Sequence, residues 1–163
     1  SSVGRLRSLG LEYVAWERVN QRVLWFCVTC GLVAGSAIIL VARLSGQPLG
    51  LELNWNMAIL ALAVGPVMEE VVFRGYLLRL ALVLTTRLPR PFASWTAVIS
   101  AAVLFASSHL AKPGITALQM FCIAGTGCIY GCIRIRYHST AASALTHAAY
   151  NLALYLSFWF GLR

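Results

Sequence analysis

One apolar run constrains the fold of this chain more than any other feature: the twenty residues from Val23 to Ala42 include no charged side chain. A helix rises 1.5 Å per residue, so about twenty apolar residues cross the roughly 30 Å hydrocarbon core of a bilayer. Of all 163 residues, 60% are hydrophobic and only 11% are charged, whereas about a quarter of a soluble domain is charged. The sequence therefore predicts a membrane protein rather than a soluble or disordered one.

Four further apolar stretches follow the first. They extend from Met57 to about Thr86 and over residues 94–111, 114–133 and 140–162. The connections between them contain proline and glycine in sequences typical of turns. We expect an all-α, polytopic membrane helix bundle of about five spans.

The chain divides into three predicted parts. In residues 1–22, apolar residues recur at helical spacing between arginines and glutamates, which indicates a cytoplasmic or interfacial amphipathic helix, or an extension of the span that follows. Residues 23–42 form the first transmembrane helix, and residues 53–163 form a four-helix membrane core.

Charge placement predicts the topology. The net charge of +8 would suggest nucleic-acid binding in a soluble protein, but these arginines cluster between apolar runs, where they set orientation in the membrane. With the N-terminus inside, the cytoplasmic segments carry Arg5, Arg7, Arg18, Arg22, Arg79, Arg87, Arg90, Arg134 and Arg136. The outer segments carry Arg43, Lys112 and Arg163. We expect a cytoplasmic N-terminus and no nucleic-acid partner.

The cysteines do not predict a redox site. Cys27, Cys30, Cys122, Cys128 and Cys132 all lie within apolar runs, where thiols are usually small core residues. Cys27 and Cys30 form a C-x-x-C sequence, but the alternating strands and helices of a redox domain are missing.

Charged residues within the apolar stretches are the most informative about a functional site. A charge at the bilayer centre costs roughly 2.5–3.5 kcal/mol, so such residues line a cavity or pair with one another. Glu70 and Arg74 are four residues apart on one helix face, which predicts an ion pair. Glu69 points about 100° away and remains free to face something else. A purely structural ion pair would not explain Glu69.

Three more polar residues lie in later apolar stretches. His109 follows Phe105 by one turn, and His147 and Asn151 project together because they are four residues apart. A single histidine in an apolar helix is usually a hydrogen-bonded core residue, but this combination on separate stretches indicates a site. We assign no role to His138, which we expect near solvent or lipid headgroups.

A carboxylate that faces two imidazoles and an amide can activate water and stabilise an oxyanion. Glu69 would take a proton from a water held against His109. His147 and Asn151 would donate hydrogen bonds to the oxyanion that develops. These roles predict hydrolysis of an amide within or at the membrane.

The chain lacks the residues that other types of membrane protease require. The chain has no aspartate for an aspartyl dyad, no H-E-x-x-H sequence for zinc and no G-x-S-x-G sequence for a serine nucleophile. Ser107 and Ser108 directly precede His109, and as helix neighbours we do not expect them to face it.

Three motifs together resemble the signatures of the CPBP family, which includes the type II CAAX prenyl endopeptidases and the bacterial Abi-type proteins. The motifs are Glu69-Glu70-x-x-x-Arg74, Phe105-x-x-x-His109 and His147-x-x-x-Asn151. Their order, and the motif-free stretch 114–133 before the last of them, also match. The resemblance covers about residues 57–160.

This resemblance implies a CPBP-like catalytic core in which Glu69 is the base and Glu70, paired with Arg74, orients it. It further implies that His109 helps to hold the water, and that His147 and Asn151 stabilise the oxyanion. The family was long described as metalloproteases, whereas an account based on a glutamate and a water needs no metal.

We expect no metal and no other cofactor, with zinc as the alternative. Glu69, His109 and His147 could form a three-ligand zinc site with an open fourth position. The nearby carboxylate left as base would then be Glu70, which the spacing ties to Arg74.

The implied function is an intramembrane glutamate-type endopeptidase acting on a membrane-associated or lipid-anchored peptide, or on a C-terminal signal. We expect a multi-pass protein of the bacterial inner membrane. The alternatives are a non-catalytic membrane immunity or scaffold protein, whose polar core only fixes helix packing, and a proton relay.

Overall fold

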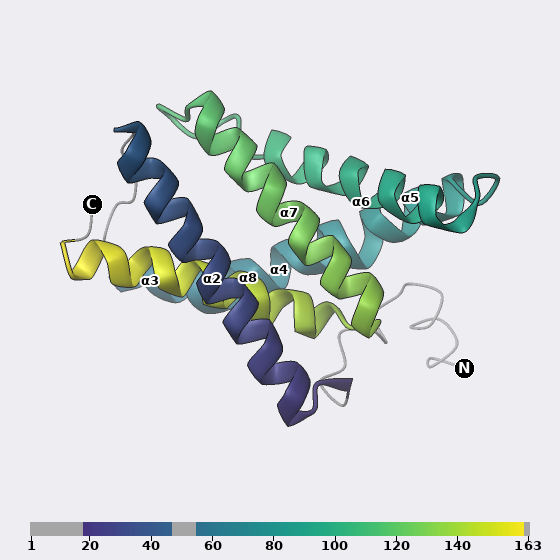
Figure 1. Ribbon diagram of the computed structural model, residues 1–163, viewed down its shortest axis with the longest axis horizontal. Helices are drawn as coiled ribbons and strands as arrows, with labels where there is room; N and C mark the ends of the chain where they lie inside the picture. The colour runs from purple at the N-terminus through teal and green to yellow at the C-terminus, as the bar shows by residue number, and fades with distance from the viewer. Residues whose placement is uncertain (1–17, 47–54, 162–163) are drawn as a thin grey trace.

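The computed structural model describes residues 18–46 and 55–161, and every regular element within these residues is helical (Figure 1). The predicted all-α bundle is therefore confirmed. The amphipathic helix expected over residues 1–22 falls mostly on residues 1–17, which lie outside the described residues.

The helices follow the predicted apolar stretches closely. Their bounds are α2 Gln21–Ser45, α3 Trp55–Ile59, η3 Leu60–Val64, α4 Gly65–Glu70, η4 Val71–Leu77, α5 Leu78–Leu84, α6 Arg90–Ser107, α7 Ala117–Tyr137 and α8 Thr140–Trp159. The elements from α3 to α5 follow one another without a break. Two of the described helices, α2 and α7, are long and apolar enough to cross a membrane.

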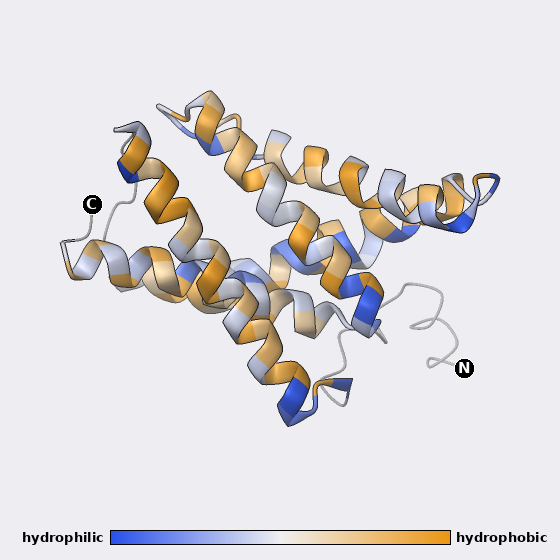
Figure 2. Cartoon of the chain, viewed as in Figure 1, coloured by the Kyte–Doolittle hydropathy of each residue, from blue (hydrophilic) through white to orange (hydrophobic). Residues whose placement is uncertain are grey.

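The outer surface of the bundle is apolar. Large hydrophobic side chains point outward along its helices, among them Leu44 on α2 and Phe121 on α7, which are 80% and 83% exposed. Figure 2 shows the corresponding orange stretches, with blue residues gathered toward several helix ends. Monomeric soluble proteins rarely expose apolar patches of this extent. Such a surface suits a lipid environment.

Close packing against α2 fixes the position of α8, which crosses it in Figure 1. Gly31 and Gly35 lie four residues apart on the side of α2 that faces α8. A Cβ atom on Gly35 would lie 2.6 Å from the Cβ of Ala153 and 2.9 Å from the carbonyl oxygen of Tyr150. Small residues at this spacing let two helix backbones approach each other, as in other membrane helix pairs.

The Gly65-Pro66 sequence loosens the second helical stretch without ending it. Pro66 has no N–H group, and the N–H of Gly65 bonds to the carbonyl of Leu60, five residues back. This bond closes the π-helical segment η3. A Cβ on Gly65 would lie 2.8 Å from that carbonyl oxygen, so the wide turn needs glycine. A second π-helical segment, η4, follows directly after Glu70, and such segments are frequent at functional sites.

Side-chain caps define the ends of the last two helices. Thr116 and Gln119 form a capping box at the start of α7. Ser139 accepts a hydrogen bond from the backbone N–H of Ala142 at the start of α8. Between these helices, His138 adopts the left-handed conformation with φ of 48°. The tight connection places the C-terminal end of α7 beside the first turn of α8.

We predict that Gly35→Ala lowers the free energy of unfolding by about 1–3 kcal/mol, because the new methyl group would force α2 away from α8. Gly125→Ala on α7 is the control, since its added Cβ would meet no heavy atom within 4 Å. The control should leave stability unchanged or raise it slightly, because alanine favours a helix. Unfolding in detergent measures both variants, and equal stabilities would contradict the close approach.

Candidate active site

A buried ion pair lies at the centre of the bundle. Glu70 ends α4 and Arg74 lies one turn later in η4, and both side chains have no exposed surface. The Nη1 atom of Arg74 donates a hydrogen bond to the Oε1 atom of Glu70 at 3.0 Å. The ion pair predicted from the spacing is confirmed.

Arg74 also connects three helical segments. Its Nη2 atom donates to the carbonyl oxygen of Gly127 on α7 at 2.9 Å. Its guanidinium carbon lies 4.5 Å from the ring centre of Phe105 on α6 and 5.2 Å from that of Tyr130 on α7. Cation–π contacts of this kind stabilise a guanidinium that has lost its water. A Cβ on Gly127 would lie 3.2 Å from Nη2, so a small residue is needed there.

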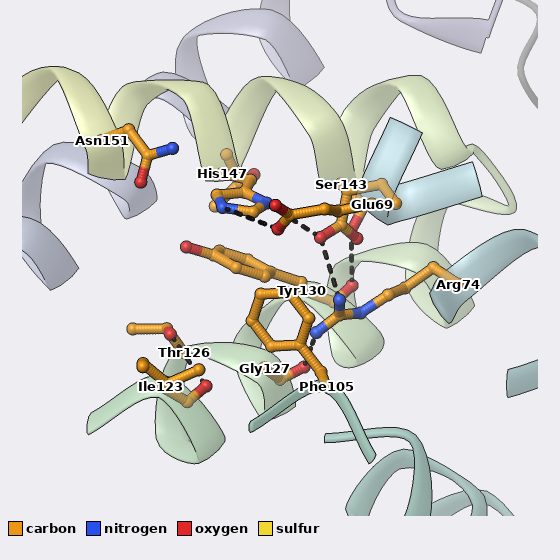
Figure 3. Close-up of polar contacts among 12 residues, drawn as sticks. Glu69, Arg74, Phe105, Ile123, Thr126, Gly127, Tyr130, Ser143, His147 and Asn151 are labelled. Carbon is orange, nitrogen blue, oxygen red and sulfur yellow. Dashed lines mark hydrogen bonds and ion pairs between the residues drawn. The ribbon is translucent and has the colours of Figure 1, made fainter. Parts of the chain in front are cut away.

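Two residues of α8 complete the surroundings of Glu70. The Ser143 hydroxyl donates to Oε2 at 2.6 Å, and the Nδ1 atom of His147 lies 3.1 Å from Oε1 (Figure 3). Both oxygens of the carboxylate are therefore occupied by donors. A buried charge needs this degree of hydrogen bonding to offset its desolvation. The Glu70 side chain is therefore fully buried, with both of its oxygens in hydrogen bonds.

His147 connects the two neighbouring glutamates. Since Glu70 accepts the hydrogen of Nδ1, the other ring nitrogen is the one left for chemistry. That atom, Nε2, lies 3.8 Å from the Oε2 atom of Glu69, whose side chain is 39% exposed. The His147 ring stacks on the ring of Tyr130 with centres 4.7 Å apart, as Figure 3 shows. The stacking and the Glu70 hydrogen bond together fix the direction of Nε2.

His109 lies just past the end of α6 and is half-buried. Its Nδ1 atom is 2.9 Å from the carbonyl oxygen of Phe105, which can only accept, so Nδ1 carries the hydrogen. The lone pair is therefore on Nε2. The ring of Phe105 contacts the rings of both histidines, with centres 5.0 Å from His109 and 5.7 Å from His147. Phe105 thus makes an edge-on contact with each of the two imidazoles.

The expectation that Ser108 would not face His109 was wrong. Its hydroxyl oxygen lies 3.3 Å from the Nδ1 atom of His109, because α6 ends at Ser107 and the chain turns there. The same hydroxyl donates to the carbonyl of Phe105 at 2.7 Å, and Nδ1 of His109 bonds to that carbonyl too. Since both groups bond to one acceptor, this contact does not make Ser108 an activated nucleophile.

Asn151 has a backbone partner that its spacing from His147 did not predict. Its Nδ2 atom donates to the carbonyl oxygen of Ala61 at 2.6 Å. This carbonyl is available because Gly65 bonds instead to Leu60 and Pro66 has no N–H to offer. In Figure 3 the amide nitrogen of Asn151 lies on the side of the residue that faces His147.

Two residues of the cluster were missed by the sequence analysis. Ser143 lies one turn before His147 on α8, so the repeating spacing of positions 143, 147 and 151 was an available signal. Tyr130, which stacks on His147, lies in an apolar stretch with no motif of its own. Nothing local to Tyr130 distinguishes it from an ordinary core aromatic residue.

The ligand set needed for zinc does not come together. Over residues 18–46 and 55–161, no three side chains of histidine, cysteine, aspartate or glutamate are grouped so that they could hold a metal ion. Glu69, His109 and His147, the ligands of the zinc alternative, do not form such a group.

The fold and the site define a class of protein, a helical membrane protein that buries a fully hydrogen-bonded ion pair next to an accessible carboxylate. The family model of the Rce1-like type II CAAX prenyl endopeptidases matches residues 51–153, more than half of the chain. The chain belongs to this family of membrane-embedded proteases. No curated protein and no solved structure gives a match.

The matched segment contains all six predicted site residues: Glu69, Glu70, Arg74, His109, His147 and Asn151. The resemblance read from the three motifs is therefore confirmed at the level of the family. The role of each residue stays a prediction.

We predict that Glu70→Gln lowers the free energy of unfolding by about 3–5 kcal/mol, because Arg74 would remain buried without its counter-charge. Glu69→Gln is the matched control, since it makes the same chemical change at the adjacent, partly exposed position. Unfolding of both purified variants in detergent measures the difference. Equal stabilities would contradict a structural role confined to Glu70.

Proposed function

We propose that the chain is an intramembrane glutamate-type endopeptidase, in which Glu69 activates a water molecule that attacks a peptide bond. One observation carries this proposal: both oxygens of Glu70 are bound to buried donors, whereas Glu69 is accessible and faces the free nitrogen of His147. Of the two neighbouring carboxylates, only Glu69 is available to a substrate.

In the first step, two acceptors hold the water. The carboxylate of Glu69 accepts one hydrogen and becomes the general base, and the lone pair on Nε2 of His109 accepts the other. Holding the water in this way directs its oxygen toward the scissile carbonyl. Attack forms a C–O bond, the proton moves to Glu69, and the carbonyl becomes a tetrahedral oxyanion.

Two donors on α8 then stabilise the oxyanion. With both ring nitrogens protonated, His147 gives its Nδ1 hydrogen to Glu70 and its Nε2 hydrogen to the oxyanion. Asn151 has a second amide hydrogen besides the one bonded to Ala61, and we assign it to the same oxyanion.

In the last step the tetrahedral intermediate collapses. The C–N bond breaks, and the proton that Glu69 took from water moves to the departing amine. The products are a carboxylic acid, which keeps the second hydrogen of the water, and an amine, and Glu69 returns to its charged form. No metal takes part in these steps.

The proposed substrate is a membrane-associated or lipid-anchored peptide, or a C-terminal signal near the membrane. The apolar exterior of the bundle supports access from the bilayer. We further propose a multi-pass protein of the bacterial inner membrane with its N-terminus in the cytoplasm, as the distribution of arginines indicates.

We predict that Glu69→Gln lowers the rate of peptide-bond cleavage by about 10²–10⁴-fold, the usual contribution of a general base. Its free energy of unfolding should change by less than about 0.5 kcal/mol, because the side chain is partly exposed. Mass spectrometry of membrane peptides from cells that make the wild type, the variant or neither protein identifies the products and compares their amounts.

Two controls separate the alternatives. Cleavage by the wild type that stops when a chelator is added would favour the zinc alternative. A cellular effect that is unchanged in Glu69→Gln, with no difference in membrane peptides, would favour the non-catalytic immunity or scaffold protein and contradict the proposed protease.

A further inference from the structure

Tyr130 lies on α7 beside the polar cluster, and none of its surface is exposed. Its ring stacks on the imidazole of His147, with the two planes only 18° apart, and the rings of Phe105 and Tyr150 contact it edge-on. Its backbone carbonyl accepts a hydrogen bond of 3.0 Å from the hydroxyl of Ser143. Contacts of both its ring and its backbone therefore fix Tyr130 against α8.

The hydroxyl group of Tyr130 is buried and has no hydrogen-bond partner among the described residues. The hydroxyl of Thr126, one turn earlier on α7, donates instead to the carbonyl oxygen of Ile123 at 3.1 Å. A hydroxyl that loses water on burial without gaining a partner costs free energy, and for this reason nearly all buried polar groups are paired. A donor held unpaired in this way is available to an acceptor that enters the site.

The direction of this hydroxyl matches the place of the proposed oxyanion. In Figure 3 the phenol oxygen lies at the end of the Tyr130 ring that is nearer to Asn151. The centres of the Tyr130 and His147 rings are 4.7 Å apart, so a carbonyl oxygen that reaches Nε2 of His147 also comes close to the stacked phenol. The Tyr130 hydroxyl therefore lies toward the side of the site where the two donors of α8 meet the substrate.

We propose that the Tyr130 hydroxyl is a third donor to the oxyanion, beside Nε2 of His147 and the second amide hydrogen of Asn151. The inference rests on the proposed function, because it concerns the intermediate of that reaction. When water attacks, the phenol O–H donates a hydrogen bond to the oxygen that gains the negative charge, and Tyr130 keeps its proton throughout. Donors that are fixed before the reaction stabilise such a charge without rearranging, and an unpaired hydroxyl on an immobile ring meets this condition.

Tyr130→Phe separates catalysis from stability. The variant keeps the aromatic ring and its stacking on His147, but it removes the unpaired hydroxyl and with it the cost of burying that group. We expect its temperature of unfolding to equal or exceed that of the wild type. We expect kcat to fall by about 10²-fold with little change in KM, because the lost donor acts on a charge that exists only in the transition state.

The experiment measures both quantities on the purified full chain in detergent. Its probe is a synthetic copy of the membrane peptide that the wild type cleaves, and mass spectrometry follows its conversion to products. Tyr150→Phe is the matched control, since it makes the same change at a neighbouring buried tyrosine whose ring meets Tyr130 edge-on. Thr126→Val is the second control, because it removes the hydroxyl one turn away on α7. Both controls should cleave the probe at the rate of the wild type.

Cleavage by Tyr130→Phe at the rate of the wild type would overturn the inference. So would a slow Tyr130→Phe that unfolds at a lower temperature, because the hydroxyl would then support the fold rather than the oxyanion. An equal loss of rate in Thr126→Val or Tyr150→Phe would also overturn it, since the effect would no longer belong to the Tyr130 hydroxyl. Glu69→Gln distinguishes the two proposals. If that variant cleaves as fast as the wild type, the proposed protease mechanism fails, whereas a slow Glu69→Gln beside a fast Tyr130→Phe removes only the third donor.

Discussion

The buried carboxylate of Glu70 is the interaction on which the rest of the site depends. In an apolar bundle an ionised side chain is tolerated only when donors surround it, and these donors come from η4 and α8. Because Arg74 is in turn bound to Gly127 on α7 and covered by Phe105 of α6, the same charge draws four helical segments together. The polar centre therefore organises the helices around it.

This arrangement explains why two adjacent glutamates can have different roles. Glu70 faces inward and orients His147 through Nδ1, while its neighbour Glu69 points toward the accessible side of the same ring. The two π-helical segments that flank α4 contribute to this difference between Glu69 and Glu70. The π-helical segment η3 leaves the Ala61 carbonyl for Asn151, and η4 begins directly after Glu70.

Local sequence patterns were enough to predict the helices and one ion pair. Contacts between residues far apart in the sequence became known only from the structure. Apolar runs of membrane length identify helices because the bilayer demands them, and a spacing of four residues brings Glu70 and Arg74 onto one face. The Tyr130 stacking and the bond from Asn151 to Ala61 join residues far apart in the sequence, and no local rule predicts them. The spacing of Gly31 and Gly35 was a readable packing signal that the sequence analysis did not use.

The most direct test of the division between the two glutamates is a pair of double-mutant cycles on the free energy of unfolding. The first cycle combines Glu70→Gln with His147→Gln, and the second combines Glu69→Gln with the same histidine change. Because Glu70 and His147 are hydrogen-bonded in the folded core, we expect a coupling energy of about 1–3 kcal/mol in the first cycle. We expect less than about 0.5 kcal/mol in the second cycle, because Glu69 is partly exposed and lies farther from the ring. A larger coupling for Glu69 than for Glu70 would contradict the account.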